Sequence, residues 1–374
     1  MARRAAPIEG LEVTVCTVPT DAPESDGTLS WDATTIVIVQ AHAGEHTGLG
    51  YSYGAAAVGG YVHEKLAGAV AGLDALDVPA AWAAMRAAIR NDGEVGIAAM
   101  ALSAVDVALW DLAARTCELP LSRLLGRYRD AVPVYGSGGF CSYSDSHLAE
   151  QLGGWADAGL RSVKMKVGRE PDGDMRRVEV ARAAIGDDVA LFVDANGAYE
   201  PFEARRWAAR YAEAGVSYFE EPVSSDDLAG LRRVRDDAPP GMAIAAGEYG
   251  YDLPYFQRML AAGAGDVQQA DATRCGGITG LLQAATVAAA HEVTFSAHCA
   301  PSIHAHACCA VRRLAHLEYF HDHVRVEGML FEGTLQPVAG QLRPDPERPG
   351  LGLELRRDAV ARYRAGGSAG PAAR

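Results

Sequence analysis

The sequence predicts an α/β fold: a closed barrel of parallel strands and helices, preceded by a smaller α+β domain. Short apolar runs recur along residues 129–328, and each run ends in an ionisable or polar residue. These terminal residues are Lys166, Asp194, Glu220, Glu248, Asp271, His298 and Glu318. Successive members are separated by 28, 26, 28, 23, 27 and 20 residues, which is the length of one strand, loop and helix. Strands repeated at this interval close into a barrel with their polar ends on one rim.

Helical segments separate the runs. Alanine-rich amphipathic stretches occupy residues 175–185, 202–214, 252–262 and 278–291. Alternation of strand and helix is typical of a parallel sheet. An earlier run at residues 132–136 supplies a first strand, so that the barrel has eight.

The first 128 residues do not follow this interval. Residues 11–18 and 33–42 have the pattern of strands, residues 20–27 that of a polar connection, and residues 96–116 that of a long helix. We therefore expect an α+β domain over residues 1–128 and a barrel over residues 129–328. Residues 329–374 should form a C-terminal segment that packs back on the first domain.

Composition limits the partners of the chain. The formal net charge of −14 disfavours nucleic acid and anionic membranes as partners. No stretch has the pattern of a signal peptide or of a membrane span. The seven cysteines lack regular spacing, which fits reduced thiols. We expect a cytoplasmic protein that forms a homo-oligomer and binds a small molecule.

Lysine is rare in this chain. Only Lys65, Lys164 and Lys166 occur among 34 basic residues, so the other 31 are arginines. Residues i and i+2 of a strand share a face, and one ammonium group lowers the pKa of the next. A lysine of lowered pKa can act as a general base, whereas arginine cannot. The pair at 164 and 166 therefore predicts acid/base chemistry, although two solvated lysines would have the same spacing.

Three carboxylates end consecutive strands. Asp194, Glu220 and Glu248 should converge at one point of the rim, where they repel one another unless a cation lies among them. Oxygen-only ligation suits Mg²⁺ better than Zn²⁺. The alternative is that the three acids cap the helices that follow them. Glu221 should point away, as a supporting residue or a salt-bridge partner.

A second acid/base group is predicted on the neighbouring strands. His298 and Asp271 end adjacent strands, and a carboxylate that accepts from one imidazole nitrogen raises the basicity of the other. Glu318, at the end of the eighth strand, should be an acid that donates to a substrate oxygen.

Two histidine pairs allow a different interpretation. Their spacing alone suggests a zinc or iron site. The first pair falls in a predicted helix, where residues i and i+2 diverge, so hydrogen-bonded loop histidines are the favoured interpretation. The pairs are His304 with His306, and His321 with His323.

Other residues near strand ends receive weaker assignments. Asn196 and Arg274 are expected near the substrate. Cys141, Cys275 and Cys299 lie just beyond strand ends, so each either lines the site or fills apolar space, and filling is the commoner use.

Together these motifs resemble the enolase superfamily, and within it the mandelate racemase subgroup. The resemblance rests on Lys-x-Lys, Asp-Ala-Asn-Gly, Glu-Glu-Pro and Gly-Glu in successive strands, followed by Asp271 with Gly-Gly-Ile-Thr-Gly, His298 and Glu318. Residues 103–112, 120–121 and 124–126 match the N-terminal capping domain of that subgroup.

The resemblance implies a modified (β/α)₇β TIM-type barrel, closed by the capping domain and the C-terminal tail, with residues 20–27 as a mobile lid. It also implies Mg²⁺ held by Asp194, Glu220 and Glu248. Lys166 would act as base on one face of the substrate, and His298, paired with Asp271, on the other. Lys164 would tune Lys166.

Several functions remain open at this point. The favoured one is Mg²⁺-dependent removal of the proton beside a carboxylate, followed by loss of water from a sugar acid to give a 2-keto-3-deoxy acid. The runner-up is a racemase or epimerase of a 2-hydroxy acid. A non-catalytic barrel and a divalent-metal hydrolase built on the histidine pairs are remote alternatives.

Overall fold

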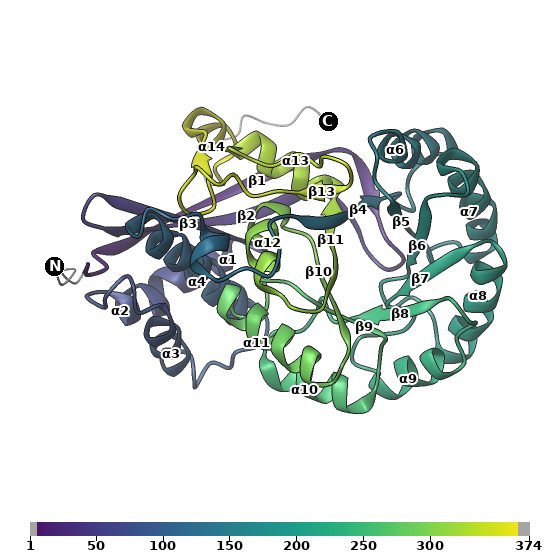
Figure 1. Ribbon diagram of the computed structural model, residues 1–374, viewed down its shortest axis with the longest axis horizontal. Helices are drawn as coiled ribbons and strands as arrows, with labels where there is room; N and C mark the ends of the chain where they lie inside the picture. Colours follow the sequence, from purple (N-terminus) through teal and green to yellow (C-terminus); the bar gives the residue numbers. More distant parts are fainter. Residues whose placement is uncertain (1–5, 366–374) are drawn as a thin grey trace.

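The computed structural model describes residues 6–365, and its larger part is the barrel expected from the sequence (Figure 1). The barrel strands lie side by side in chain order and run parallel, and the last pairs with the first to close the ring. They are β4 (Val132–Gly138), β5 (Ser162–Lys166), β6 (Ala190–Asp194), β7 (Val216–Glu220), β8 (Ala243–Ala246), β9 (Val267–Ala270), β10 (Thr294–Ala297) and β11 (Leu314–Phe320). The predicted fold class is confirmed.

A helix follows each strand and covers the outside of the ring (Figure 1). The helices are α6 (Asp145–Asp157), α7 (Pro171–Ile185), α8 (Pro201–Glu213), α9 (Leu228–Asp236), α10 (Leu253–Ala262), α11 (Gly277–Ala290), α12 (Pro301–Ala307) and α13 (His321–Leu330). The 3₁₀ helix η2 (Cys308–Ala310) extends α12.

The alternation of side chains along β5 shows how the barrel positions its polar residues. Val163 and Met165 point outward into the apolar cluster formed with the covering helices. The intervening lysines, Lys164 and Lys166, point inward to carboxylates on neighbouring strands. The backbone register places Lys166 opposite Asp194, and Asp194 opposite Glu220. Residues that are distant in sequence therefore end at one level of the rim.

The N-terminal domain is an antiparallel sheet with helices on one side. Its strands are β1 (Gly10–Ser25), β2 (Ser30–Ala43) and β3 (His46–Tyr53). Its helices are α1 (Ala57–Tyr61), the π-helix η1 (Val62–Leu66), α2 (Ala67–Val70), α3 (Val78–Ala88), α4 (Ile97–Thr116) and α5 (Leu121–Leu124).

Two features of this sheet differ from the prediction. Residues 20–25 were expected to lie in a polar connection, but they belong to β1. The pairing of β1 with β2 resumes after a bulge, where Glu24 pairs with Trp31. The hydrogen bonds to β2 therefore hold these residues in a strand despite their polar composition. The strand β3 is absent from the prediction because its glycines have low strand propensity.

The glycines of β3 are explained by the close approach of α4. A Cβ atom added at Gly48 would lie 2.2 Å from the Ala108 carbonyl oxygen, and one added at Gly50 would lie 2.3 Å from that of Ala104. By length and composition, the helix α4 is apolar enough to cross a membrane. This corrects the expectation that no segment has the pattern of a membrane span. However, 83% of its most apolar window is buried inside the protein, so it serves as a core helix.

The β1–β2 hairpin reaches over the rim of the barrel (Figure 1). The Ser25 carbonyl accepts a hydrogen bond from the Cys141 backbone N–H at 2.7 Å, and His321 Nε2 lies 3.0 Å from Asp21 Oδ2. At the tip, a Cβ atom added to Gly27 would lie 2.4 Å from the Ala195 carbonyl oxygen, so only glycine allows this close approach. The hairpin thus forms one wall above the strand ends.

The C-terminal segment returns to the N-terminal domain. Its elements are β12 (Phe331–Glu332), which pairs with β14 (Glu354–Leu355), β13 (Gln341–Leu342), which pairs with β4, and α14 (Arg357–Tyr363). On α4, Asp111 accepts a hydrogen bond from the Leu351 N–H at 2.5 Å, and Arg115 donates to Glu354 Oε1 at 2.8 Å. Residues 1–5 and 366–374, which belong to the predicted capping domain and tail, lie outside the described residues.

Candidate active site at the barrel rim

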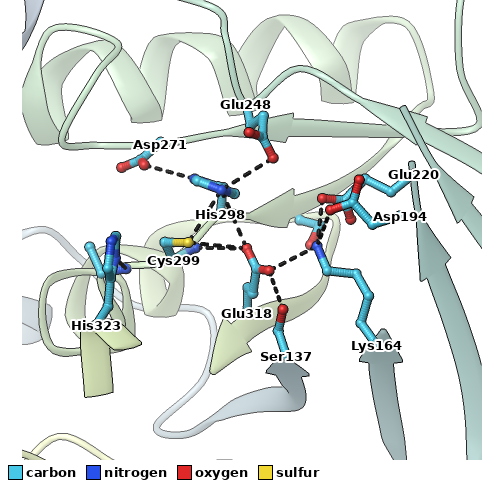
Figure 2. Close-up of polar contacts among 12 residues, drawn as sticks. Ser137, Lys164, Asp194, Glu220, Glu248, Asp271, His298, Cys299, Glu318 and His323 are labelled. Atoms are coloured by element: carbon cyan, nitrogen blue, oxygen red, sulfur yellow. Dashed lines mark hydrogen bonds and ion pairs between the residues drawn. The ribbon is translucent and has the colours of Figure 1, made fainter. Parts of the chain in front are cut away.

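The eight residues predicted to carry catalysis or metal binding lie together at the C-terminal ends of β5–β11, and most of them are seen in Figure 2. All eight are buried, with exposed fractions between 0% and 6%. They are Lys164, Lys166, Asp194, Glu220, Glu248, Asp271, His298 and Glu318. The regular spacing of polar strand ends in the sequence therefore identified residues that lie close together in the fold.

Three carboxylates cluster at one place in the site. Asp194, Glu220 and Glu248 each offer an oxygen, and these atoms all lie within 4.8 Å of one another. Glu220 Oε2 is buried without a hydrogen-bonding partner. Burial, together with the charge of Asp194, raises the pKa of Glu220 well above its usual value. A buried oxygen-only cluster with an unpaired ligand atom fits a hard divalent cation.

The two lysines face these carboxylates. Lys164 Nζ lies 2.5 Å from Glu220 Oε1 and 2.8 Å from Glu318 Oε1, and Lys166 Nζ lies 2.6 Å from Asp194 Oδ2. Burial, the largest influence, and Lys164 lower the pKa of Lys166, whereas Asp194, Glu248 and Glu318 raise it, and the net pKa is raised. The expected lowering of this pKa is therefore not present. A cation that engages Asp194 would weaken the ion pair that holds Lys166 protonated.

His298 lies on the other side of the site. Its Nδ1 is 2.8 Å from Asp271 Oδ2, and its Nε2 is 3.2 Å from Glu248 Oε2 (Figure 2). Burial lowers the pKa of His298, whereas Cys299, the neighbouring carboxylates and the bond to Asp271 raise it well above its usual value. The predicted pairing of His298 with Asp271 is present.

Glu318 is held as a hydrogen-bond acceptor. Ser137 Oγ donates to its Oε1 at 2.6 Å, and the Cys299 N–H donates to its Oε2 at 3.1 Å. Burial raises the pKa of Glu318, but Lys164 and His298 offset this and hold the pKa well below the usual range. The surroundings of Glu318 therefore stabilise its carboxylate form, whereas the sequence predicted an acid. Ser137 is missing from the prediction because the first barrel strand was expected to end at residue 136.

A cavity of about 340 Å³ lies between these residues and the β1–β2 hairpin. Asn196 and Arg274, both expected near the substrate, line it. Arg274 Nη1 donates to the Glu248 carbonyl at 3.2 Å. The remaining lining includes groups that the sequence did not indicate as part of the site: Leu29, Trp31, Thr34, Thr35, Tyr53, Phe320 and His323. The cavity can therefore hold a small carboxylate beside the carboxylate cluster.

The histidine pairs do not form metal sites. Both ring nitrogens of His304 bond to backbone atoms, the Cys299 carbonyl at 2.7 Å and the Ala272 N–H at 2.9 Å. Burial lowers the pKa of His306 to about 4. The ring of His323 stacks on Tyr53 with centroids 3.4 Å apart. His321 and His323 open α13, so the expected loop position is wrong. The expected hydrogen-bonding use holds for His304, whereas His306 Nδ1 is buried without a hydrogen-bonding partner among the described residues.

Glu221 and the three cysteines near strand ends lie in different surroundings. Glu221 is buried and, within residues 6–365, makes no ion pair, so the salt-bridge expectation is wrong. It lines a separate hollow of about 480 Å³. Cys299 lines the candidate active site, whereas Cys275 is part of an apolar cluster and Cys141 borders a groove beside the hairpin.

Models of two protein domains match the chain in order. Residues 11–126 match the mandelate racemase/muconate lactonizing enzyme N-terminal domain, and residues 147–359 match the enolase C-terminal domain-like family. The chain belongs to the mandelate racemase subgroup of the enolase superfamily. The resemblance inferred from the motifs is therefore confirmed, and the protein is an enzyme of that superfamily.

Three similar proteins illustrate the range of this subgroup. A mandelate racemase/muconate lactonizing enzyme-like protein from Rubrobacter xylanophilus is 60% identical, with a TM-score of 0.95 over 96% of this chain and 100% of that one. D-galactarolactone cycloisomerase from Agrobacterium fabrum is 30% identical over 92% of this chain and 95% of its own length. L-talarate/galactarate dehydratase from Salmonella typhimurium, solved with Mg and L-lyxarohydroxamate, is 27% identical, with a TM-score of 0.88 over 98% of this chain and 96% of that one.

Proposed function

We propose that this enzyme dehydrates a sugar acid to a 2-keto-3-deoxy acid with the help of Mg²⁺. The observation that carries the proposal is that two acid/base groups, Lys166 and His298, both line a cavity that adjoins the three-carboxylate cluster. The dehydratase named above, which was solved with Mg, supports the reaction class.

Asp194, Glu220 and Glu248 would hold the metal. When bound, Mg²⁺ supplies the positive charge that stabilises a carboxylate as it gains a second negative charge. Lys164, already 2.8 Å from Glu318, adds a fixed ammonium to the same region. Without this charge, the proton beside a carboxylate is too weakly acidic for a side-chain base.

The residues of the chain perform the proton transfers. Lys166 Nζ takes the proton from carbon 2. The imidazolium of His298, oriented by Asp271 at 2.8 Å, gives a proton from Nε2 to the hydroxyl group that leaves carbon 3. Loss of that hydroxyl as water gives an enol, which becomes the 2-keto-3-deoxy acid.

The lining favours a substrate with a single carboxylate. Lys166 and Arg274, the lysine and arginine among the described lining residues, both lie beside the carboxylate cluster. On the hairpin side the wall carries Asp26, Leu29 and Trp31. Burial lowers the pKa of His323 to about 3, so its ring is neutral there. Among the described residues that line the cavity, no lysine or arginine lies on that wall, so a second carboxylate at the distal end would meet no cation there.

A second candidate reaction is epimerisation of a 2-hydroxy acid. It is favoured by the same two acid/base groups, because a proton returned to carbon 2 from the opposite face inverts that centre.

A substrate screen separates these reactions. The Mg²⁺-loaded enzyme is incubated with hexonates, pentonates and aldarates, and keto acids are detected as semicarbazones. We expect a keto acid from a monocarboxylate that carries hydroxyl groups on carbons 2 and 3. If no library member gave a keto acid while a 2-hydroxy acid was epimerised, dehydration would be rejected in favour of epimerisation.

A further inference from the structure

Cys299 lies between two of the acid/base residues, in a backbone conformation that side chains rarely adopt. Its φ angle is +53°, and that of Ala300 is +39°. The thiol is 3% exposed and borders the substrate cavity. Left-handed non-glycine residues cost free energy and gather at functional sites. In this backbone conformation, Cys299 Sγ points toward His298 and Glu318 (Figure 2).

The three donor atoms form a triangle of suitable size for a transition metal. Cys299 Sγ lies 3.2 Å from His298 Nε2 and 3.4 Å from Glu318 Oε2, and these last two atoms lie 3.6 Å apart. Tetrahedral zinc with ordinary bond lengths to sulfur, nitrogen and oxygen places such donors about 3.3 to 3.6 Å apart. The observed triangle lies within a few tenths of an ångström of one face of that tetrahedron. The cavity leaves the fourth position open to water or to a ligand.

The surrounding contacts prepare each donor for a metal. Asp271 bonds His298 Nδ1 at 2.8 Å, which leaves Nε2 as the ligating nitrogen. Ser137 and Lys164 both bond Glu318 Oε1, and Oε2, which accepts from the Cys299 N–H at 3.1 Å, keeps a second lone pair for a metal. A carboxylate behind a metal-binding histidine is the usual support of zinc sites. Glu248 Oε2 also lies 3.2 Å from Nε2, so a metal ligated by His298 replaces that contact.

We propose that His298, Cys299 and Glu318 form a second metal site, separate from the three-carboxylate cluster, that takes Zn²⁺ or another thiophilic divalent cation. The thiol releases its proton to solvent when the metal binds. A nitrogen, sulfur and oxygen donor set favours Zn²⁺ and Co²⁺, whereas Mg²⁺ prefers oxygen ligands. Under the proposed function, a metal at this site blocks the reaction because it occupies His298 Nε2.

A spectroscopic experiment tests metal binding without any assay of activity. The full-length protein is saturated with Mg²⁺, so that the carboxylate cluster is filled, and titrated with Co²⁺. A thiolate bound to Co²⁺ gives a near-ultraviolet charge-transfer band, which carboxylate ligation does not give. We expect this band in the unmodified protein and in Cys141→Ser, and its absence in Cys299→Ser. His298→Asn should weaken the Co²⁺ affinity at least about tenfold, which provides a second variant if Cys299→Ser fails to fold.

Inhibition gives an independent measurement. Zn²⁺ should inhibit competitively with substrate, and Cys299→Ser should raise the half-inhibiting concentration by about 100-fold. Absence of the Co²⁺ band in the unmodified protein, or its persistence in Cys299→Ser, would overturn the site. A chain that binds Co²⁺ through Cys299 but forms no keto acid would keep the metal site and reject the proposed reaction, so the two failures are distinguishable.

Discussion

Replacing Glu248 by glutamine or Asp194 by asparagine should lower kcat/KM for keto-acid formation by about 10³-fold or more. Each substitution keeps the shape of the side chain and removes one negative charge from a cluster whose oxygens lie within 4.8 Å of one another. The affinity for Mg²⁺ should fall with the activity, because each of the three carboxylates would supply one ligand atom. Steady-state kinetics and Mg²⁺ titration calorimetry measure the two effects.

The control for these variants is Glu203→Gln, which makes the same chemical change on the exposed surface of α8. It should leave both kcat/KM and Mg²⁺ affinity unchanged. Retention of full activity and Mg²⁺ dependence in Glu248→Gln or Asp194→Asn would show that the metal site lies elsewhere.

Replacing Lys166 by alanine should lower kcat by about 10² to 10⁴-fold, which is the range for loss of a general base. The three carboxylates remain, so Mg²⁺ should still bind. The affinity for Mg²⁺ should rise, because the Lys166 ammonium, 2.6 Å from Asp194 Oδ2, no longer competes for that oxygen. Single-turnover kinetics and Mg²⁺ titration check these two expectations together.

Lys65→Ala is the matched control, since Lys65 is the lysine outside the site and pairs with Asp92 at 3.2 Å on the surface. It should behave as the unmodified enzyme. A Lys166→Ala variant with undiminished kcat would remove Lys166 from the mechanism. A variant that failed to bind Mg²⁺ would instead assign Lys166 a structural role in the carboxylate cluster.

The barrel and its polar rim were predictable because their signal is periodic. Each run ends in one polar residue, and parallel strands of a barrel bring those ends together, so the interval alone grouped residues as distant as Lys166 and Glu318. The pairing of His298 with Asp271 followed from the same strand order.

The remaining differences come from tertiary contacts that a local pattern does not encode. The strand β3 is glycine-rich because α4 lies against it, and residues 20–25 join β1 because they pair with β2. Protonation states also depend on distances. The pKa of Lys166 is raised because Asp194 is closer to it than the sequence reveals, and Glu318 is a carboxylate because Lys164 lies 2.8 Å away.

Exchange of the carbon-2 proton with solvent deuterium tests most directly whether Lys166 and His298 act from opposite faces. Lys166→Ala and His298→Asn are each incubated in D₂O with Mg²⁺ and with both 2-epimers of the sugar acid found in the screen, and exchange is followed by NMR. Opposed bases require that each variant lose exchange with one epimer only, and that the two variants lose different epimers. Loss of exchange with the same epimer in both variants, with the other epimer unaffected, would contradict the opposed placement.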